Sequence, residues 1–205
     1  CILLPDVCYA FLEKDVHLLN MQNGLADNTV SAVYKDKEGF VWFGTRNGLS
    51  RYDGRQITNF EQSNSYPSIS NLKEVFDGVL AFVDNGVFSA FDLKKERFLS
   101  VVSSSEKRIP SWGMLQKNDS LVWVISGSEL HLMKRCASKE GELRLRVQEK
   151  YTGWDNQDNL LVAITYSSDK KSICLIDEKG RIILLDATNL NSFRVIDLGR
   201  TGSLS

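Results

Sequence analysis

The sequence has little of what marks several protein classes. Its 205 residues include only three prolines and no biased tract, which argues against long disordered linkers. No run of about 18 apolar residues occurs, so no segment has the pattern of a membrane-spanning helix. The formal net charge is -1, which gives no basic surface for nucleic acid or an anionic membrane. The apolar fraction of 42% is enough for a sizeable globular core.

Histidine and cysteine are too scarce to assemble a catalytic or metal site. His17 has no carboxylate or cysteine partner at motif spacing, and His131 is expected as an exposed or half-buried strand residue. Cys136 and Cys174 have no second pair at zinc-ligand spacing. We therefore predict no catalytic residue, no metal and no cofactor. Two buried thiols are favoured for these cysteines, with a single disulfide between them as the alternative.

The first ten residues, CILLPDVCYA, do not resemble the start of a folded domain. An apolar run is followed by Pro5 and Asp6, and then by small residues before a cleavage site at Phe11. This pattern is typical of the end of a secretory signal peptide, with a buried first strand as the alternative. We expect residues 1–10 to be a signal-peptide remnant and the chain to be exported.

The rest of the chain has the pattern of β-strands. Runs of four to seven β-branched and aromatic residues alternate with Gly-containing turns, and no helical period persists for a dozen residues. The first unit predicts strands at 28–36, 40–45, 49–53 and 56–60. Asn47 and Gly48 favour a tight hairpin, because such turns need positive φ.

This four-stranded unit recurs along the chain. Residues 111–133 align without a gap on residues 30–52, which places Trp123 on Trp42. Weaker copies place Leu80 and Leu175 at the Trp42 position. Four short strands every 40–45 residues indicate β-propeller blades, with a β-sandwich as the structural alternative. We predict an all-β, partial β-propeller of about four blades of four antiparallel strands, with blades at 24–60, 67–101, 109–149 and 158–198.

The first unit resembles the two-component-regulator propeller repeat. The repeat has three conserved parts: Gly-Leu-x-x-Asn-x-Val, Asp-x-x-Gly-x-x-Trp-x-Gly-Thr and Gly-Leu-x-Arg-Tyr-Asp. This chain matches the first part at Gly24, Leu25, Asn28 and Val30, and the second at Asp36, Gly39, Trp42, Gly44 and Thr45. It matches the third part at Gly48, Leu49, Arg51, Tyr52 and Asp53. Residues 201–205 resemble the opening of another repeat. The blades are therefore expected to be cut from a larger ring, with open edges that invite self-association.

The resemblance implies a setting and a function. Such repeats form the periplasmic sensor part of hybrid two-component systems in Bacteroides-type bacteria, where typical stimuli are oligosaccharides released from glycans. The family implies control of polysaccharide-utilisation genes, histidine kinase activity outside this chain, and a homodimeric full-length protein. Its expected partners are the remaining blades and downstream domains of the same protein, with no nucleic acid bound by this region and no membrane span. The propeller itself is expected to have no catalytic activity.

A ligand site is expected on one face of the propeller. The loops joining strands two and three, and those between blades, share this face around the central channel. An aromatic ring beside amides and charges suits a sugar, whose C–H face stacks while its hydroxyls form hydrogen bonds. The candidate residues are Arg46, Asn47, Tyr66, Arg108, Trp112, Trp154 and Asp155.

Each candidate also has a purely structural interpretation. Trp154 lies in a polar loop, but it could instead fill the gap between blades. Arg46 could pair with a uronate or sulfate, or remain a solvated turn residue. Trp42 and Trp123 are expected in the core, and Asp36, Asp53 and Asp186 as caps of turns. A scaffold without its own ligand, and less plausibly a propeller lyase or glycosidase, remain as alternative functions.

Overall fold

The computed structural model describes residues 18–61, 68–103, 108–152, 154 and 159–197. The signal-peptide interpretation of residues 1–10, the start of a further repeat at 201–205, and the candidates Tyr66 and Asp155 lie outside these ranges. Within them, the chain forms sixteen strands and one short 3-10 helix, Met21–Asn23. No helix of the described ranges is long and apolar enough to cross a membrane.

The strands form four consecutive antiparallel units of four, which we call blades one to four. Blade one holds β1 (Val30–Lys35), β2 (Val41–Thr45), β3 (Gly48–Tyr52) and β4 (Ile57–Phe60). Blade two holds β5 (Ile69–Phe76), β6 (Val79–Asp84), β7 (Val87–Asp92) and β8 (Arg97–Ser103). Blade three holds β9 (Gly113–Asn118), β10 (Leu121–Ser126), β11 (Glu129–Cys136) and β12 (Glu142–Tyr151). Blade four holds β13 (Leu161–Tyr166), β14 (Ser172–Asp177), β15 (Ile182–Asp186) and β16 (Phe193–Ile196).

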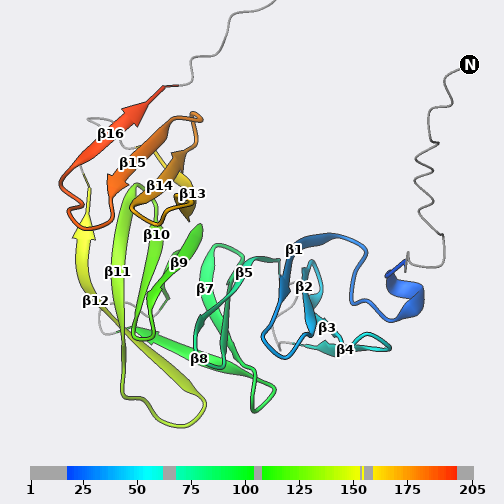
Figure 1. The fold of residues 1–205 in the computed structure, drawn as a ribbon. Helices are drawn as coiled ribbons and strands as arrows, with labels where there is room; N and C mark the ends of the chain where they lie inside the picture. The colour runs from blue at the N-terminus through cyan, green and yellow to red at the C-terminus, as the bar shows by residue number, and fades with distance from the viewer. Residues whose placement is uncertain (1–17, 62–67, 104–107, 153, 155–158, 198–205) are drawn as a thin grey trace, which may run out of the picture.

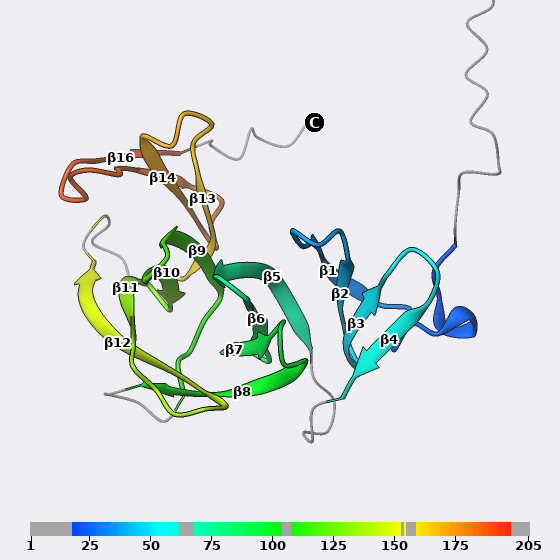
Figure 2. The same cartoon turned by 60° about the horizontal axis from the view of Figure 1, so that its bottom comes forward.

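The four blades follow one another along an arc (Figures 1 and 2). The first strands of the blades, β1, β5, β9 and β13, contact one another in sequence and lie on the inner side of the arc in Figure 2. Each blade packs face to face against its neighbour, as in a propeller. The predicted partial β-propeller is thus confirmed.

Three apolar clusters hold the arc together, one at each seam between neighbouring blades. Trp42 and Leu49 of blade one pack with Ile69 and Phe82 of blade two. Val83 of blade two packs in the cluster it shares with blade three, and Trp123 in the cluster shared with blade four. Trp42 and Trp123 are each only 1% exposed, which confirms that both are core residues.

The alignment of blades two and four on blade one is wrong by one residue. Thr45 pairs with Gly48 and Asp84 pairs with Val87 across equivalent two-residue turns, which puts Ala81 rather than Leu80 at the Trp42 position. Leu80 accordingly packs against the preceding blade, whereas Trp42 packs against the following one. Leu175 also faces its preceding blade, beside Trp123. A strand has a period of two, so a slip of one residue exchanges its faces.

Blades two and three share one sheet, which the sequence did not predict. Their outermost strands β8 and β12 pair in parallel, from Glu142 opposite Ser100 to Leu145 opposite Ser103, and join the blades into eight strands. Glu140, just before β12, also accepts from Lys95 and Arg97 of blade two at 2.7 and 3.0 Å.

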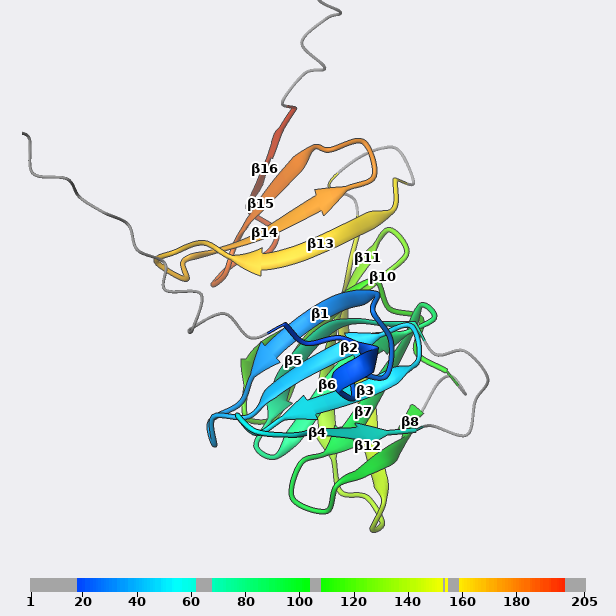
Figure 3. The same cartoon turned by 90° about the vertical axis from the view of Figure 1, so that its right-hand side faces the viewer.

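The two ends of the arc differ. The outer side of blade one is covered by the segment around the 3-10 helix, which lies in front of β2 and β3 in Figure 3. Ala26 N–H donates to Ser50 Oγ, Asn59 Nδ2 donates to the Gly24 carbonyl, and Leu25 is buried. The outer side of blade four has no such cover in the described residues, and Val162 and Ile176 there are 45% and 37% exposed.

Candidate functional site

The turns of the blades define two opposite faces of the arc. The face we call the Asn47 face holds the β2–β3 turn and its equivalents, together with the segments that lead into each first strand. Backbone hydrogen bonds connect these parts, from Asn85 to Ser68, from Ser111 to Gly86 and from Leu161 to Gly127. The face we call the Asp36 face holds the β1–β2 and β3–β4 turns and their equivalents.

Four of the predicted ligand residues lie exposed on the Asn47 face. Arg46 and Asn47 form the tip of the β2–β3 turn, and Arg108 and Trp112 lie in the segment that leads into β9. The Trp112 side chain is 50% exposed, and its carbonyl accepts from Asn71 Nδ2 at 3.0 Å. An exposed indole held on an ordered backbone fits the expected stacking surface for a sugar.

Trp154 does not fit the predicted site. Its side chain is only 8% exposed and belongs to the apolar cluster between blades three and four, with Trp123 and Leu175. The ring therefore offers no free surface for stacking. Its polar sequence neighbours suggested that the ring is exposed. The ring instead fills the gap between two blades, which was the alternative interpretation of this residue.

The most distinctive motif residues of blade one are structural. The Asp36 carboxylate is buried and accepts from Trp42 Nε1 at 2.7 Å and from the Phe40 N–H at 2.8 Å. In blade three Lys117 replaces Asp36, and its Nζ lies 4.7 Å from the Trp123 ring centre. Trp123 Nε1 therefore lacks the carboxylate acceptor that Trp42 has. A cation–π contact thus replaces a hydrogen bond in the degenerate copy.

The other acidic turn residues behave as predicted. Asp53 accepts from the Arg55 and Gln56 N–H groups, and Asp186 accepts from Thr188 and Asn189. These bonds hold the pKa of both carboxyls below the usual value, with the Gln56 N–H as the largest contribution at Asp53 and the Thr188 hydroxyl at Asp186. Both residues therefore cap turns.

Arg51 ties blade one to blade two. Its guanidinium lies 4.7 Å from the Phe40 ring centre, 5.5 Å from Trp42 and 5.4 Å from Phe60. Its Nη1 also donates to Glu96 in the β7–β8 turn of blade two. An arginine among aromatic rings gains cation–π attraction while it keeps its ion pair, so it stabilises this seam.

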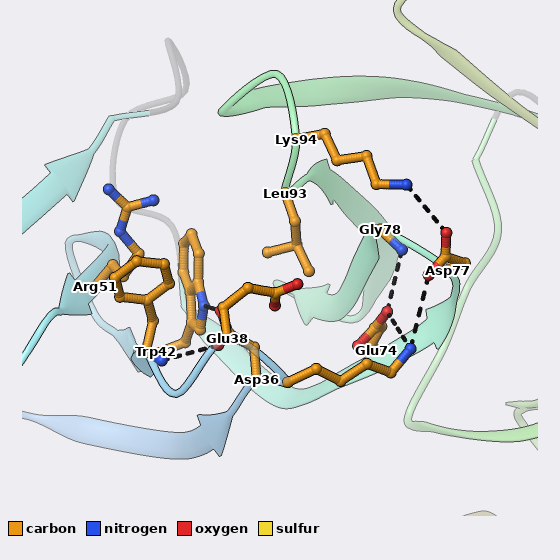
Figure 4. A pocket seen from close by; sticks show the side chains of 11 residues that line it. Asp36, Glu38, Trp42, Arg51, Glu74, Asp77, Gly78, Leu93 and Lys94 are labelled. Atoms are coloured by element: carbon orange, nitrogen blue, oxygen red, sulfur yellow. Dashed lines mark hydrogen bonds and ion pairs between the residues drawn. The ribbon is translucent and has the colours of Figure 1, made fainter.

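A cavity of about 220 Å³ opens at the same seam on the Asp36 face (Figure 4). Blade one contributes the β1–β2 turn and Arg51, and blade two contributes the β5–β6 and β7–β8 turns. Its lining residues are Asp36, Lys37, Glu38, Phe40, Trp42, Arg51, Glu74, Asp77, Gly78, Leu93 and Lys94. The sequence did not predict this cavity, because its residues come from separate turns that only the packing of two blades brings together.

A chain of ion pairs forms one wall of the cavity. Lys37 Nζ lies 3.1 Å from Glu74 and 3.7 Å from Asp77, and Lys94 Nζ lies 3.1 Å from Asp77. The Glu74 side chain is 8% exposed and also accepts from the Gly78 N–H at 3.1 Å. Lys94, and then Lys37, hold the pKa of Asp77 below its usual value. This wall is therefore charged but internally paired.

His131 and the cysteines occupy structural positions. His131 is buried rather than exposed or half-buried, and its Nε2 lies 2.6 Å from Glu129 Oε2. The hydrogen bond from His131 holds the pKa of Glu129 below its usual value. Cys136 and Cys174 are free, half-buried thiols, so they form no bridge with each other. No group of three or more His, Cys, Asp or Glu side chains in the described ranges could hold a metal ion.

Comparisons with known proteins agree with the motif and the fold. Residues 24–47 match the family model of the two component regulator propeller. No curated protein matches the chain.

Two similar structures are extracellular domains from B. thetaiotaomicron. One belongs to a protein described as a one component system, at 16% identity and a TM-score of 0.66, over 87% of this chain and 26% of that one. The other belongs to a protein described as a hybrid two component system, at 18% identity and a TM-score of 0.65, over 85% and 24%. The chain thus spans about a quarter of each of these structures.

The virginiamycin B lyase of Staphylococcus aureus is similar as well. It matches at 11% identity with a TM-score of 0.62, over 87% of this chain and 58% of that one. At such low identity these structures establish the fold alone, while the motif identifies the repeat. In residues 24–47 the chain carries the two-component regulator propeller repeat, within a partial β-propeller.

Proposed function

We propose that the chain is the sensor propeller of a hybrid two-component signalling protein, located in the periplasm, and that it detects oligosaccharides derived from glycans. The observation that carries the proposal is the regulator-propeller repeat at residues 24–47. The likeness to extracellular domains of B. thetaiotaomicron signalling proteins supports an extracytoplasmic location. By this proposal, further domains carry the histidine kinase, regulate polysaccharide-utilisation genes and form a homodimer.

The proposed contact surface is the Asn47 face around Trp112. The half-exposed indole offers an apolar surface to the C–H face of a sugar. Arg46, Asn47 and Arg108 are exposed on the same face and supply hydrogen-bond donors to hydroxyls or to an anionic substituent. Tyr66 and Asp155 remain predicted contacts.

Calorimetry against a panel of glycan fragments tests the proposal. If a fragment binds, Trp112→Ala should weaken its affinity about tenfold or more, because stacking on an aromatic ring is lost. Phe193→Ala is the matched control, since Phe193 is 44% exposed on blade four, on the outermost strand. Equal affinities of Trp112→Ala and the parent chain would place the ligand elsewhere.

Two alternatives have distinct outcomes in the same experiment. A scaffold without its own ligand would bind no fragment of the panel. The likeness in fold to a lyase motivates an assay for chain cleavage by the purified protein. Turnover of any fragment would contradict the proposal that this region is not an enzyme.

A further inference from the structure

The cavity between blades one and two contains a carboxylate that the fold does not use. Glu38 lines the cavity and is exposed, and it makes no hydrogen bond or ion pair within the part of the chain that the structure describes. Figure 4 shows its carboxylate pointing into the middle of the labelled side chains. The other carboxylates of the lining are already engaged, Asp36 by Trp42 and Glu74 by Lys37.

The surrounding charged groups are paired with one another. Lys37, Glu74, Asp77 and Lys94 form the paired wall opposite Trp42, and Gly78 donates its backbone N–H to Glu74. Leu93 and the partly buried Phe40 add apolar surface. A polar ligand would therefore meet one buried carboxylate, that of Glu74, which Lys37 and the Gly78 N–H hold from two sides, beside ion pairs exposed to solvent.

The charge balance of the lining disfavours an anionic ligand. Four carboxylates, those of Asp36, Glu38, Glu74 and Asp77, face three cations, Lys37, Arg51 and Lys94. A uronate or sulfate would approach the free carboxylate of Glu38, and like charges repel. Neighbouring hydroxyl groups suit this carboxylate better, since its two oxygens accept several hydrogen bonds.

We propose that this cavity binds one neutral sugar unit of an oligosaccharide, with Glu38 accepting hydrogen bonds from two adjacent hydroxyl groups. The volume of about 220 Å³ limits the occupant to roughly one such unit. This proposal rests on the proposed function, because it takes the ligand to be a glycan. It adds a second contact, on the face opposite Trp112, which touches blade one and blade two together.

Indole N–H signals in NMR spectra distinguish the two sites. The chain has four tryptophans, of which Trp42 lines the cavity and Trp112 lies on the Asn47 face. Cellobiose and maltose serve as neutral probes, and a uronate-containing disaccharide serves as the anionic probe. A neutral probe should shift the Trp42 signal saturably, and Glu38→Ala should weaken this binding about tenfold, the loss of a charge-assisted hydrogen bond. Glu61→Ala is the control, because Glu61 is exposed and lies outside the cavity lining.

The possible outcomes separate this proposal from the proposed function. If Trp112→Ala abolishes binding while Glu38→Ala leaves it unchanged, the cavity proposal is overturned and the sensor proposal stands. The cavity proposal is also overturned if no probe shifts the Trp42 signal. It is overturned likewise if the uronate probe binds more tightly than the neutral probes at the Trp42 site. An unchanged spectrum of Glu38→Ala without ligand confirms that the variant is folded, so a lost shift then reports lost binding.

Discussion

At the scale of single residues, the motif of blade one encodes packing between blades rather than chemistry. Asp36 and Trp42 belong together because the carboxylate satisfies the only polar group of a buried indole. Arg51 connects the same aromatic cluster to Glu96 of the next blade. The residues that make the repeat recognisable are therefore those that fix one blade against another.

Replacing Asp36 should be costly for this reason. Asp36→Ala leaves the Trp42 indole N–H and the Phe40 N–H without their acceptor, and we expect a loss of about 2–4 kcal/mol in the free energy of unfolding. Urea denaturation measures the loss. Asp53→Ala, which removes an exposed cap, should cost clearly less than Asp36→Ala. Equal losses would contradict the role of the buried indole.

Gly44 should tolerate no side chain. A Cβ at this position would lie 2.8 Å from Ile69 Cγ2 and 2.9 Å from the Ile69 carbonyl oxygen, so part of the obstacle is the backbone of blade two. We expect Gly44→Ala to cost about 1–3 kcal/mol of stability, measured by thermal or urea unfolding.

Gly113→Ala provides the control for Gly44. Gly113 also lies in a seam, but a Cβ there would meet its nearest atoms, in Ile125 and Ile164, at 3.4 Å. The smaller crowding should make the second substitution clearly milder. A Gly113→Ala variant as unstable as Gly44→Ala would show that the Ile69 contact is not the cause.

At the scale of elements, the sequence predicted the strands and the blades but not every register. Trp123 was placed correctly on Trp42, because blade three keeps both the tryptophan and the lengths of the two turns that flank its strand. Leu80 and Leu175 were misplaced because their blades lack the tryptophan, and alternating apolar residues fit either face of a strand buried on both sides. Where both faces are apolar, periodicity alone cannot select the register.

The site was predictable only in part, for a related reason. Arg46 and Asn47 follow from a local turn signal, and both are exposed where the motif places them. Trp154 could not be judged locally, since its burial depends on blades three and four together. The cavity depends even more on tertiary packing, because Glu38 and Lys94 lie in different blades.

The β14–β15 turn should make stability depend on pH. Burial raises the pKa of Asp177, but the Arg181 N–H and guanidinium outweigh burial and hold it below the usual value. A lowered folded-state pKa contributes stability above the unfolded-state pKa, about 4, and this contribution is lost as the pH falls through the folded-state value. Asp177→Asn should thus be less stable by about 1–3 kcal/mol at pH 7, with a gap that narrows toward pH 3.

Urea denaturation at pH 7, 5 and 3 measures this gap. Glu178→Gln in the same turn is the control, because Glu178 is exposed and should show little difference from the parent chain at each pH. A gap for Asp177→Asn that stays constant between pH 7 and pH 3 would exclude an electrostatic origin.

At the scale of the whole molecule, the arc has one covered end and one apolar end. Residues 20–28 hydrogen-bond across the outer side of blade one. The outer side of blade four instead presents Ala163, Cys174, Ile176, Ile182 and Leu184 at sheet positions that form cores between the other blades. An open repeat end of this kind requires a cover to remain soluble.

We expect the purified chain to self-associate through this open side of blade four. Sedimentation velocity should show a sedimentation coefficient that rises with protein concentration. Ile176→Lys should reduce the association, because it places a charge in the apolar surface. Val33→Lys, at a 60% exposed position of blade one, should leave it unchanged. Association of Ile176→Lys as strong as that of the parent chain would point to another surface.

The parallel pairing of β8 with β12 divides the molecule into unequal parts. A cut between blades one and two breaks no strand pairing within the described residues, whereas a cut between blades two and three breaks a continuous hydrogen-bonded sheet. Blades two and three should therefore be inherited, exchanged and grafted as a pair. A recombination junction should be tolerated between blades one and two or between blades three and four. A junction between blades two and three should not be tolerated.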